Sequence, residues 1–303
     1  MHEITIHPGE HALQNAIDSL PADGAPATIR LAPGEYREKV ELRRDNVTLE
    51  GAGADATRIV WADAATAPHP DGMNTGTFRS YTLLVLADNC TLRGLTVQNA
   101  AAPREKVGQC VALFADGDLF TCEDVTLLSA QDTLFTAPLP PKEALKNGFL
   151  GPTQFLPRKP QRHTYRRCVI KGDVDFIFGG AAAWFEDCDV VSINAYTDGR
   201  VPGGYATAAS TPEGQKYGYI FRNCRFLRRR RGRSDHVSGP PVARVCENRA
   251  HRLRDRRPHQ TRGLGQLEQA ALRRDRPVRR VRLLWPRQRH VRPGGVLPRA
   301  DRR

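Results

Sequence analysis

Short segments of β-branched and aliphatic residues recur along the first three quarters of the chain, each bounded by Gly, Asn or Asp. Residues 46–51 (Asn-Val-Thr-Leu-Glu-Gly) resemble residues 89–94 (Asn-Cys-Thr-Leu-Arg-Gly), and residues 122–126 (Cys-Glu-Asp-Val-Thr) resemble residues 187–191 and 223–226. One short strand in each step of roughly 20 residues is typical of a solenoid, whose coils bury their inward side chains only by stacking on one another. A β-sandwich is the alternative, but hairpin turns such as Asn-Gly between alternating strands are scarce, so parallel stacking is favoured.

Cysteine spacing supports the same repeat. Cys90 and Cys110 are 20 residues apart, and so are Cys168 and Cys188. The seven cysteines include no Cys-x-x-Cys pair, so neither a metal site nor an obligatory disulfide framework is indicated. We therefore expect the cysteines to act as small apolar residues in interior stacks rather than as redox groups.

One helix is predicted near the start of the chain, just before Pro21, with an apolar face formed by Leu13, Ala16, Ile17 and Leu20. Strands are predicted at residues 28–31, 40–42, 47–49 and 83–86. Residues 138–160 hold six prolines and interrupt the repeat. This composition predicts a long excursion from the solenoid, of the kind that often forms the wall of a cleft.

The last quarter of the chain has a different composition. Residues 228–303 contain 24 Arg and 6 acidic residues but no Lys, Ile, Phe or Tyr, which gives a formal charge of +18. Since the whole chain carries +13, residues 1–227 carry −5, and the basic character belongs to the tail. A basic arm for nucleic acid or another polyanion is one interpretation of this tail.

Acidic and amide side chains occur inside apolar segments. Asp132 lies in Ser-Ala-Gln-Asp-Thr-Leu, Asp175 lies in Gly-Asp-Val-Asp-Phe-Ile-Phe-Gly-Gly, and Gln109 lies in Gly-Gln-Cys-Val-Ala-Leu. A bare carboxylate is costly inside a buried strand, so each Asp is expected to face a groove on the outside of the solenoid or to bond to a turn. Each motif alone is explained more simply by a solvated or turn-bonded side chain.

Taken together and in their order along the chain, around Gln109, Asp132 and Asp175, the three motifs resemble those of the pectin methylesterase (pectinesterase) family. Residues 34–38 (Gly-Glu-Tyr-Arg-Glu) resemble the Gly-x-Tyr-x-Glu of that family, and residues 76–80 resemble its Gly-Thr-x-x-Ser. The resemblance covers residues 4–227 and implies an all-β fold, a right-handed parallel β-helix with a short N-terminal helix. It implies a carboxylic ester hydrolase that releases methanol from methyl-esterified pectin or oligogalacturonide and leaves an acidic galacturonan.

Taken residue by residue, the resemblance implies that Asp175 is the nucleophile and that Asp132 is the general acid and then the general base. It implies that Gln109 and Gln131 donate hydrogen bonds to the oxyanion. Two nearby carboxylates can divide into one ionised and one protonated group, and neutral amides donate without titrating, so these residue types suit the chemistry. No metal or other cofactor is required. Contacts to the sugar are implied for Phe178 and Thr77.

The Leu-Gly-Arg-Pro-Trp segment of the family is absent from its expected place after residue 226. In the family its Arg holds the nucleophilic carboxylate and its Trp lines the sugar groove. Codons permitted for residues 237–248, read one base out of register, can encode Tyr-Leu-Gly-Arg-Pro-Trp-Arg-Ala-Tyr-Ala-Lys. Residues 258–268 and 285–293 can give two further family-like segments in the same way. We therefore predict a shift of reading frame within residues 227–233.

Under this prediction residues 4–227 form an incomplete β-helix domain, and residues 228–303 form an aberrant tail that is disordered or arbitrarily packed. Little or no activity is expected of such a chain. The alternative function is a non-catalytic β-helix that binds acidic polysaccharide, and a galacturonan hydrolase or lyase on the same fold is disfavoured by the paired Asp motifs.

We expect a monomer with no nucleic-acid or membrane partner, since no stretch approaches the ~18 apolar residues of a membrane span. The sequence that starts with residues 1–4 lacks the basic and apolar regions of a signal peptide, so none is visible. The location is therefore left open, being cytoplasmic as the sequence stands and secreted if the true start codon lies upstream.

Overall fold

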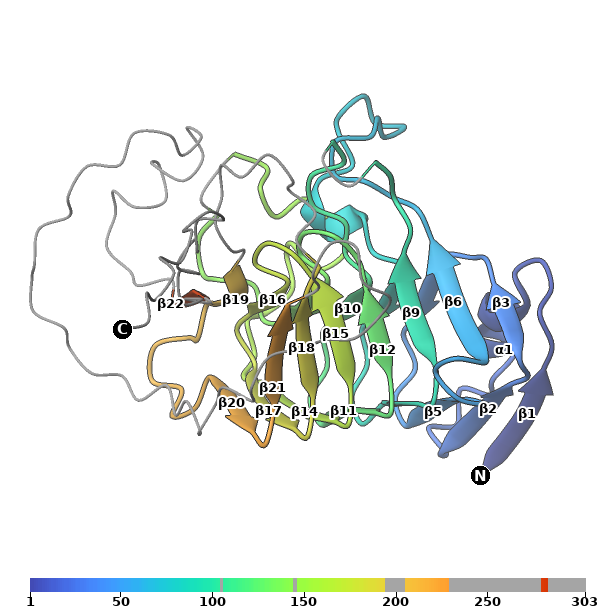
Figure 1. Cartoon of the computed structure of the whole chain (residues 1–303). Helices are drawn as coiled ribbons and strands as arrows, with labels where there is room; N and C mark the ends of the chain where they lie inside the picture. Colours follow the sequence, from blue (N-terminus) through green and yellow to red (C-terminus); the bar gives the residue numbers. More distant parts are fainter. Residues whose placement is uncertain (104–105, 144–145, 194–204, 229–278, 283–303) are drawn as a thin grey trace, which may run out of the picture.

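Three β-sheets wind around a common core to form a parallel β-helix (Figure 1). In this computed structural model the described residues are 1–103, 106–143, 146–193, 205–228 and 279–282. Each coil contributes a strand to the sheets in turn, and the strands of each sheet stack in chain order, which confirms the predicted β-helix. No helix in the described part of the chain is long and apolar enough to cross a membrane.

The first sheet contains β1 (His2–Ile6), β2 (Ala27–Leu31), β5 (Val47–Gly51), β8 (Thr91–Arg93), β11 (Phe120–Glu123), β14 (Arg162–Arg166), β17 (Ala182–Glu186) and β20 (Tyr219–Arg222). The second sheet contains β3 (Gly34–Tyr36), β6 (Thr57–Trp61), β9 (Thr96–Asn99), β12 (Thr126–Leu128), β15 (Val169–Gly172), β18 (Asp189–Ser192) and β21 (Arg225–Arg228). The third sheet contains β4 (Val40–Leu42), β7 (Leu83–Val85), β10 (Leu113–Ala115), β13 (Leu134–Thr136), β16 (Ile177–Gly179), β19 (Tyr205–Ala209) and β22 (Arg279–Arg282). The four strands predicted from the sequence correspond to β2, β4, β5 and β7.

Helix α1 (Ala12–Asp18) lies at the N-terminal end of the solenoid, against β1, β2 and β4. Its predicted apolar face is buried in the main core. The buried carboxylate of Glu38 accepts hydrogen bonds from the backbone N–H groups of Leu13 (2.9 Å) and Gln14 (3.0 Å). These are among the first donors of the helix, where no intrahelical acceptor exists and the helix dipole favours a negative charge. Glu38 therefore fastens the helix to the first coil.

A single residue in the left-handed region turns the chain from the first sheet into the second. This position is held by Asp124, Arg167, Asp187 and Asn223, with φ between 50° and 55°. Asp and Asn tolerate this conformation better than most residues do. The next residue along the chain is buried in each coil, and these residues are Val125, Cys168, Cys188 and Cys224.

All six cysteines in the described part of the chain are buried and free, as predicted. The repeat that we inferred from their spacing is only half right. Cys168 and Cys188 occupy the same position in successive coils, but Cys90 precedes β8 whereas Cys110 lies between β9 and β10. Cys122 lies inside β11 and pairs with Tyr165, so it is not the counterpart of Cys188 either. Because loops of different length interrupt the coils, a fixed spacing does not identify equivalent positions.

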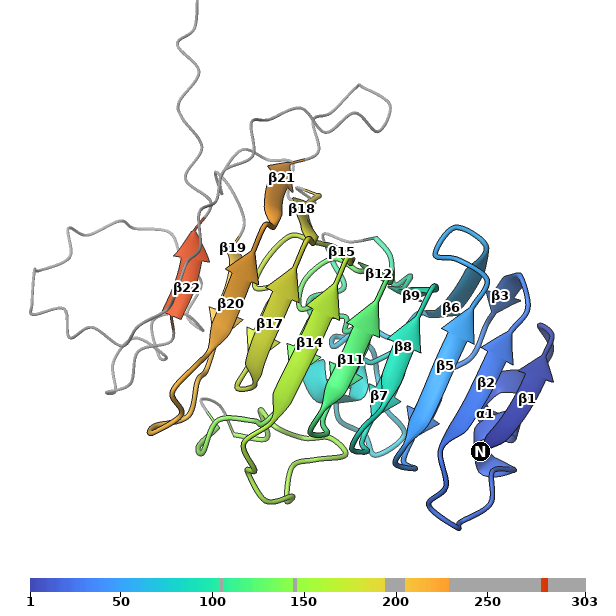
Figure 2. The same cartoon turned by 90° about the horizontal axis from the view of Figure 1, so that it is seen from below.

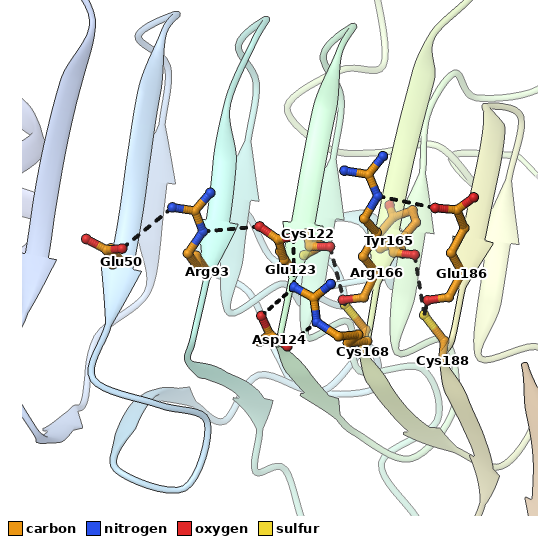
Figure 3. Close-up of polar contacts among 11 residues, drawn as sticks. Glu50, Arg93, Cys122, Glu123, Asp124, Tyr165, Arg166, Cys168, Glu186 and Cys188 are labelled. Atoms are coloured by element: carbon orange, nitrogen blue, oxygen red, sulfur yellow. Dashed lines mark hydrogen bonds and ion pairs between the residues drawn. The ribbon is translucent and has the colours of Figure 1, made fainter.

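A row of alternating charges runs along the outer face of the first sheet (Figure 3). The strand register places one charged residue on each of seven successive strands, in the order Arg30, Glu50, Arg93, Glu123, Arg166, Glu186 and Arg222. Arg93 lies 3.6 Å from Glu50 and 3.2 Å from Glu123 across the neighbouring strands. Opposite charges directly across a strand pair stabilise that pairing, so this charge row favours the observed register.

The C-terminal end of the third sheet carries one strand from the Arg-rich tail. Strand β22 pairs with β19 in the antiparallel direction, beside the last coil (Figure 2). This strand lies in the segment that we predicted to be an aberrant tail, either disordered or arbitrarily packed. The rest of the tail after residue 228, including the segments of the proposed frame shift, lies outside the described residues.

Candidate active site

The predicted catalytic residues gather at one corner of the solenoid, where the chain passes from the second sheet to the third. Gln131 and Asp132 lie between β12 and β13. Asp175 lies between β15 and β16, one coil further along, and Gln109 lies between β9 and β10, one coil earlier. Three successive coils therefore supply the candidate site, and β10, β13 and β16 are neighbours in the third sheet.

Asp132 and Asp175 occupy the same position in adjacent coils. Each precedes by two residues a core residue of the third sheet, and those core residues, Leu134 and Ile177, are register partners. The backbone N–H of Asp132 donates to the carbonyl of Val174 at 3.1 Å, which holds the two turns side by side. Since neighbouring strands are about 4.8 Å apart, the two carboxyl groups project from adjacent levels of the same corner.

Both aspartates adopt the left-handed backbone conformation, with φ of 63° at Asp132 and 49° at Asp175. A non-glycine residue in this region is uncommon, although Asp is among the residues that tolerate it. The turn before Asp175 also depends on a glycine, because a Cβ at Gly172 would lie 2.3 Å from the Cβ of Phe176. These constraints explain why an Asp lies within an apolar stretch of sequence. Asp175 occupies the turn between β15 and β16 and not the middle of a strand.

The two glutamines are paired with each other. Gln109 and Gln131 form an isolated parallel bridge, and the N–H of Cys110 donates to the carbonyl of Gln131 at 3.1 Å. Beyond this bridge the earlier coil holds one extra residue, because Ala112 and Leu113 both donate to the carbonyl of Thr133, at 2.9 and 3.1 Å. This arrangement is a bulge, and bulges re-aim the side chains beside them.

Phe178 lies at the edge of an aromatic cluster on the outer face of the third sheet. Its ring centroid is 4.9 Å from that of Phe135 and 6.1 Å from that of Phe78. Phe135 and Phe114 beneath it are almost fully buried, whereas Phe178 is half-buried. The cluster therefore presents a partly exposed ring next to the turn that carries Asp175.

Thr77 belongs to a separate segment, a short 3-10 helix at Thr77–Arg79, and it is half-buried. Two residues close to Thr77 connect this segment to the third sheet and to the segment before β10. Phe78 packs against Phe178, and the hydroxyl of Ser80 accepts a hydrogen bond from the N–H of Val111 at 3.2 Å. The segment that carries Thr77 is thus held against the aromatic cluster that contains Phe178.

Sequence reasoning missed Asn99, which holds the segment between β9 and β10 that carries Gln109. The buried amide of Asn99 donates to the carbonyls of Asp63 (2.9 Å), Ser80 (2.7 Å) and Val111 (3.2 Å). Its side-chain oxygen accepts from the N–H of Ala101 at 3.0 Å. A single Asn at the end of a strand gives no signal of this role in the sequence, because its four partners come from separate segments.

The candidate site combines acid groups of unequal exposure. Asp132 is 8 % exposed and Asp175 is half-buried. Carboxyl groups on adjacent coils can divide their roles between a proton donor and an ionised nucleophile. No group of three or more His, Cys, Asp or Glu residues arranged to hold a metal occurs in the described ranges.

Comparisons with known proteins agree on one family. The family profile described as Pectinesterase matches residues 8–139 and 151–238. Pectinesterase A from Dickeya chrysanthemi is 32 % identical over 231 residues, which cover 71 % of this chain and 57 % of that protein. Probable pectinesterase/pectinesterase inhibitor 64 from Arabidopsis thaliana is also 32 % identical, over 70 % of this chain and 32 % of its own length. The chain thus covers 57 % of the Dickeya protein and 32 % of the Arabidopsis protein.

Solved structures show the same likeness. A pectin methylesterase in complex with a hexasaccharide superposes with a TM-score of 0.60 and 31 % identity, covering 72 % of this chain and 61 % of that chain. Pectin methylesterase from Yersinia enterocolitica gives a TM-score of 0.61 and 33 % identity, covering 72 % of this chain and 65 % of the other.

Proposed function

The chain belongs to the pectinesterase family, and from this premise we propose that its site is built to hydrolyse the methyl esters of pectin. The observation that carries the proposal is the placement of Asp132 and Asp175 at equivalent positions of adjacent coils, beside the paired Gln109 and Gln131. Acyl transfer needs a nucleophile, a proton shuttle and donors to the oxyanion, and two carboxyl groups and two amides are residue types that can meet these needs, which supports the proposal.

In the proposed first half of the reaction, a carboxylate oxygen of Asp175 attacks the carbonyl carbon of a galacturonate methyl ester. Negative charge develops on the carbonyl oxygen, and the side-chain amides of Gln109 and Gln131 donate hydrogen bonds to it. The C–O bond to the methoxy group then breaks, and the carboxylic acid of Asp132 gives its proton to the departing oxygen. Methanol leaves, and an anhydride joins Asp175 to the sugar carbonyl.

In the second half, the carboxylate of Asp132 accepts a proton from water as the water oxygen attacks the anhydride carbonyl. The bond to Asp175 breaks, which frees its carboxylate and releases a galacturonate acid. Asp132 ends protonated, and the product ionises in solvent. Phe178 and Thr77 are proposed to contact the sugar rings. We propose that the chain acts as a monomer.

We also propose that the domain is cut short by a shift of reading frame near residue 227. Residues 4–227 would then hold the acid groups and amides, but the family's Arg that steadies the nucleophile would be missing. Activity of this 303-residue chain is therefore proposed to be weak. We call the product of the shifted frame, fused after residue 227, the frame-restored chain.

Methanol release from highly methylated pectin tests the site. In the frame-restored chain, Asp175→Ala should abolish release while binding of the polymer persists. Release that survives Asp175→Ala would overturn the assignment of the nucleophile. Binding by both forms without release by either would instead support a non-catalytic polysaccharide-binding domain.

A further inference from the structure

The bulge that follows Gln109 leaves one backbone donor without a partner on the next coil. Ala112 and Leu113 both donate to the carbonyl of Thr133, whereas the N–H of Val111, the residue before them, has no main-chain acceptor among the described residues. Val111 is buried, and a buried N–H without an acceptor costs about as much free energy as a lost hydrogen bond. The bulge therefore needs a side chain that accepts from Val111.

Ser80 supplies this acceptor from the segment that carries Thr77. Its hydroxyl oxygen lies 3.2 Å from the nitrogen of Val111, and the same hydroxyl donates to the carbonyl of Thr77 at 2.8 Å. A serine hydroxyl has one hydrogen to donate and two lone pairs that accept, so both bonds can form together and fix its orientation. Ser80 is wholly buried, where such bonds are electrostatically stronger than in water.

Ser129 holds the residue directly after Gln109 from the following coil. Its hydroxyl donates to the carbonyl of Cys110 and lies 3.1 Å from the sulfur of the same residue. Ser129 is buried and lies two residues before Gln131. One hydroxyl therefore joins the segment that carries Gln109 to the segment that carries Gln131.

Asn99 provides the third bond from within the same coil as Gln109. Its side-chain amide donates to the carbonyl of Val111 at 3.2 Å, and it also donates to the carbonyls of Ser80 and Asp63. Two amide hydrogens thus serve three carbonyl oxygens, which uses the full donor capacity of the group. A carboxylate in the same place would set its oxygens against those carbonyls, so the position requires an amide.

Three buried side chains therefore bond to the backbone of the two residues that follow Gln109. We call these side chains the backbone clamp, and they are Asn99, Ser80 and Ser129. The carbonyl of Gln109 itself accepts from the N–H of Ala65 at 2.8 Å. The backbone is thus fixed at Gln109 and directly after it, as a side chain that must be held in one productive geometry requires.

We propose that the backbone clamp positions the side-chain amide of Gln109 for the oxyanion, which makes Asn99, Ser80 and Ser129 positioning residues of the reaction. The proposal rests on the proposed function. None of the three belongs to the proposed catalytic set, so each acts through Gln109. A displacement of about 1 Å at a reacting centre can cost about 10²-fold in rate, so the loss of one clamp bond lowers the rate although no catalytic group is removed.

Steady-state methanol release by the frame-restored chain tests the positioning role. Ser80→Ala and Ser129→Ala should each lower kcat by about tenfold and change KM by less than about twofold, because the oxyanion donor acts mainly in the transition state. In a Gln109→Ala background each should lower kcat by less than about twofold further, since the amide that they position is absent. A merely structural role would lower kcat by the same factor in both backgrounds.

Thr96→Val is the matched control. Thr96 lies on β9, the strand that ends at Asn99, and its buried hydroxyl donates to the carbonyl of Ala54 at 2.6 Å. This variant removes a buried bond between a hydroxyl and a carbonyl but no bond to the clamped residues. It should leave kcat unchanged in both backgrounds. A thermal melt of each variant shows whether the fold is retained.

Hydrogen exchange of the 303-residue chain tests the clamp without any need for turnover. In Ser80→Ala, peptides that cover residues 107–113 should exchange about tenfold faster, because the N–H of Val111 loses its acceptor, and Thr96→Val should leave them unchanged. Unaltered exchange in Ser80→Ala overturns the clamp.

The outcomes separate this inference from the function on which it rests. A frame-restored wild type that releases no methanol sinks the proposed function and the catalytic role of the clamp with it, while the exchange measurement still decides whether the clamp exists. Normal release by the wild type, with losses in Ser80→Ala and Ser129→Ala that are equal in the two backgrounds or with no losses at all, overturns the positioning role alone.

Discussion

Gln109 and Gln131 are bridged across adjacent coils one residue out of step with the strands that follow them, where Leu113 pairs with Leu134. Three residues of the earlier coil therefore lie opposite two of the later coil. Without this bulge, Gln109 would be level with Ala130 and not with Gln131. The extra residue therefore puts the backbones of Gln109 and Gln131 level with each other, and Gln131 directly precedes Asp132.

The paired amides predict the effect of removing either one. In the frame-restored chain, Gln131→Ala or Gln109→Ala should lower kcat by about 10²–10³ with little change in KM, because an oxyanion donor acts mainly in the transition state. Gln98→Ala is the control, since Gln98 lies on β9 of the same coil away from the bridge. Steady-state kinetics of methanol release measure both parameters. An increase in KM with kcat unchanged would mean that the glutamines bind the substrate and do not stabilise the oxyanion.

The buried imidazole of His163 predicts a dependence of stability on pH. Its complete burial lowers the pKa to about 4, although a ring nitrogen lies 3.0 Å from the carbonyl of Gly117. Because the unfolded chain binds a proton near pH 6.5 and the folded chain does not, stability is full above that pH and falls as pH drops from about 6.5 to about 4. The loss is on the order of 3 kcal/mol.

Urea unfolding of the wild type and His163→Gln between pH 4 and pH 7 measures this effect. The variant lacks the titrating ring, so its free energy of unfolding should change less over the same interval. Parallel pH profiles for the two proteins would show that His163 is not the group responsible.

The charge row on the first sheet predicts a salt-dependent contribution to stability. Glu123 pairs with Arg93 at 3.2 Å and with Arg167 at 2.8 Å, so Glu123→Ala should lower the free energy of unfolding by about 1 kcal/mol at low salt and by less at high salt. Glu35→Ala removes an exposed acid whose one ion pair among the described residues is with Arg37, two positions along the chain, and it should have a smaller effect. Identical urea midpoints for both variants at low salt would contradict the prediction.

The coarse architecture follows from local signals in the sequence. Asn46 and Asn89 begin equivalent strands with φ of 61° and 53°, and the amide of Asn89 donates to the side-chain oxygen of Asn46 at 2.7 Å. Their likeness in sequence therefore reflects a true stacking position. Asp175 likewise lies in a turn whose left-handed backbone conformation only a few residue types tolerate.

Features that depend on register between coils could not be predicted. The charge row becomes visible only when Glu50, Arg93 and Glu123 are aligned across strands that are separated by loops of unequal length. Because these loops differ in length, the equal spacing of Cys90 and Cys110 wrongly suggested that they occupy equivalent positions. The bulge at Gln109 and the four bonds of Asn99 are also products of contact between distant segments, which a single sequence does not display.

Methanol release from methylated pectin by the 303-residue chain, compared with the frame-restored chain and its Asp175→Asn variant, tests the central claim most directly. We predict release by the frame-restored chain that exceeds that of the 303-residue chain by about 10² or more, in line with the cost of losing a charged group that steadies the reacting centre. Asp175→Asn should reduce methanol release to the level seen without enzyme. Equal, robust release by the 303-residue and frame-restored chains, or release that persists in Asp175→Asn, would contradict the account.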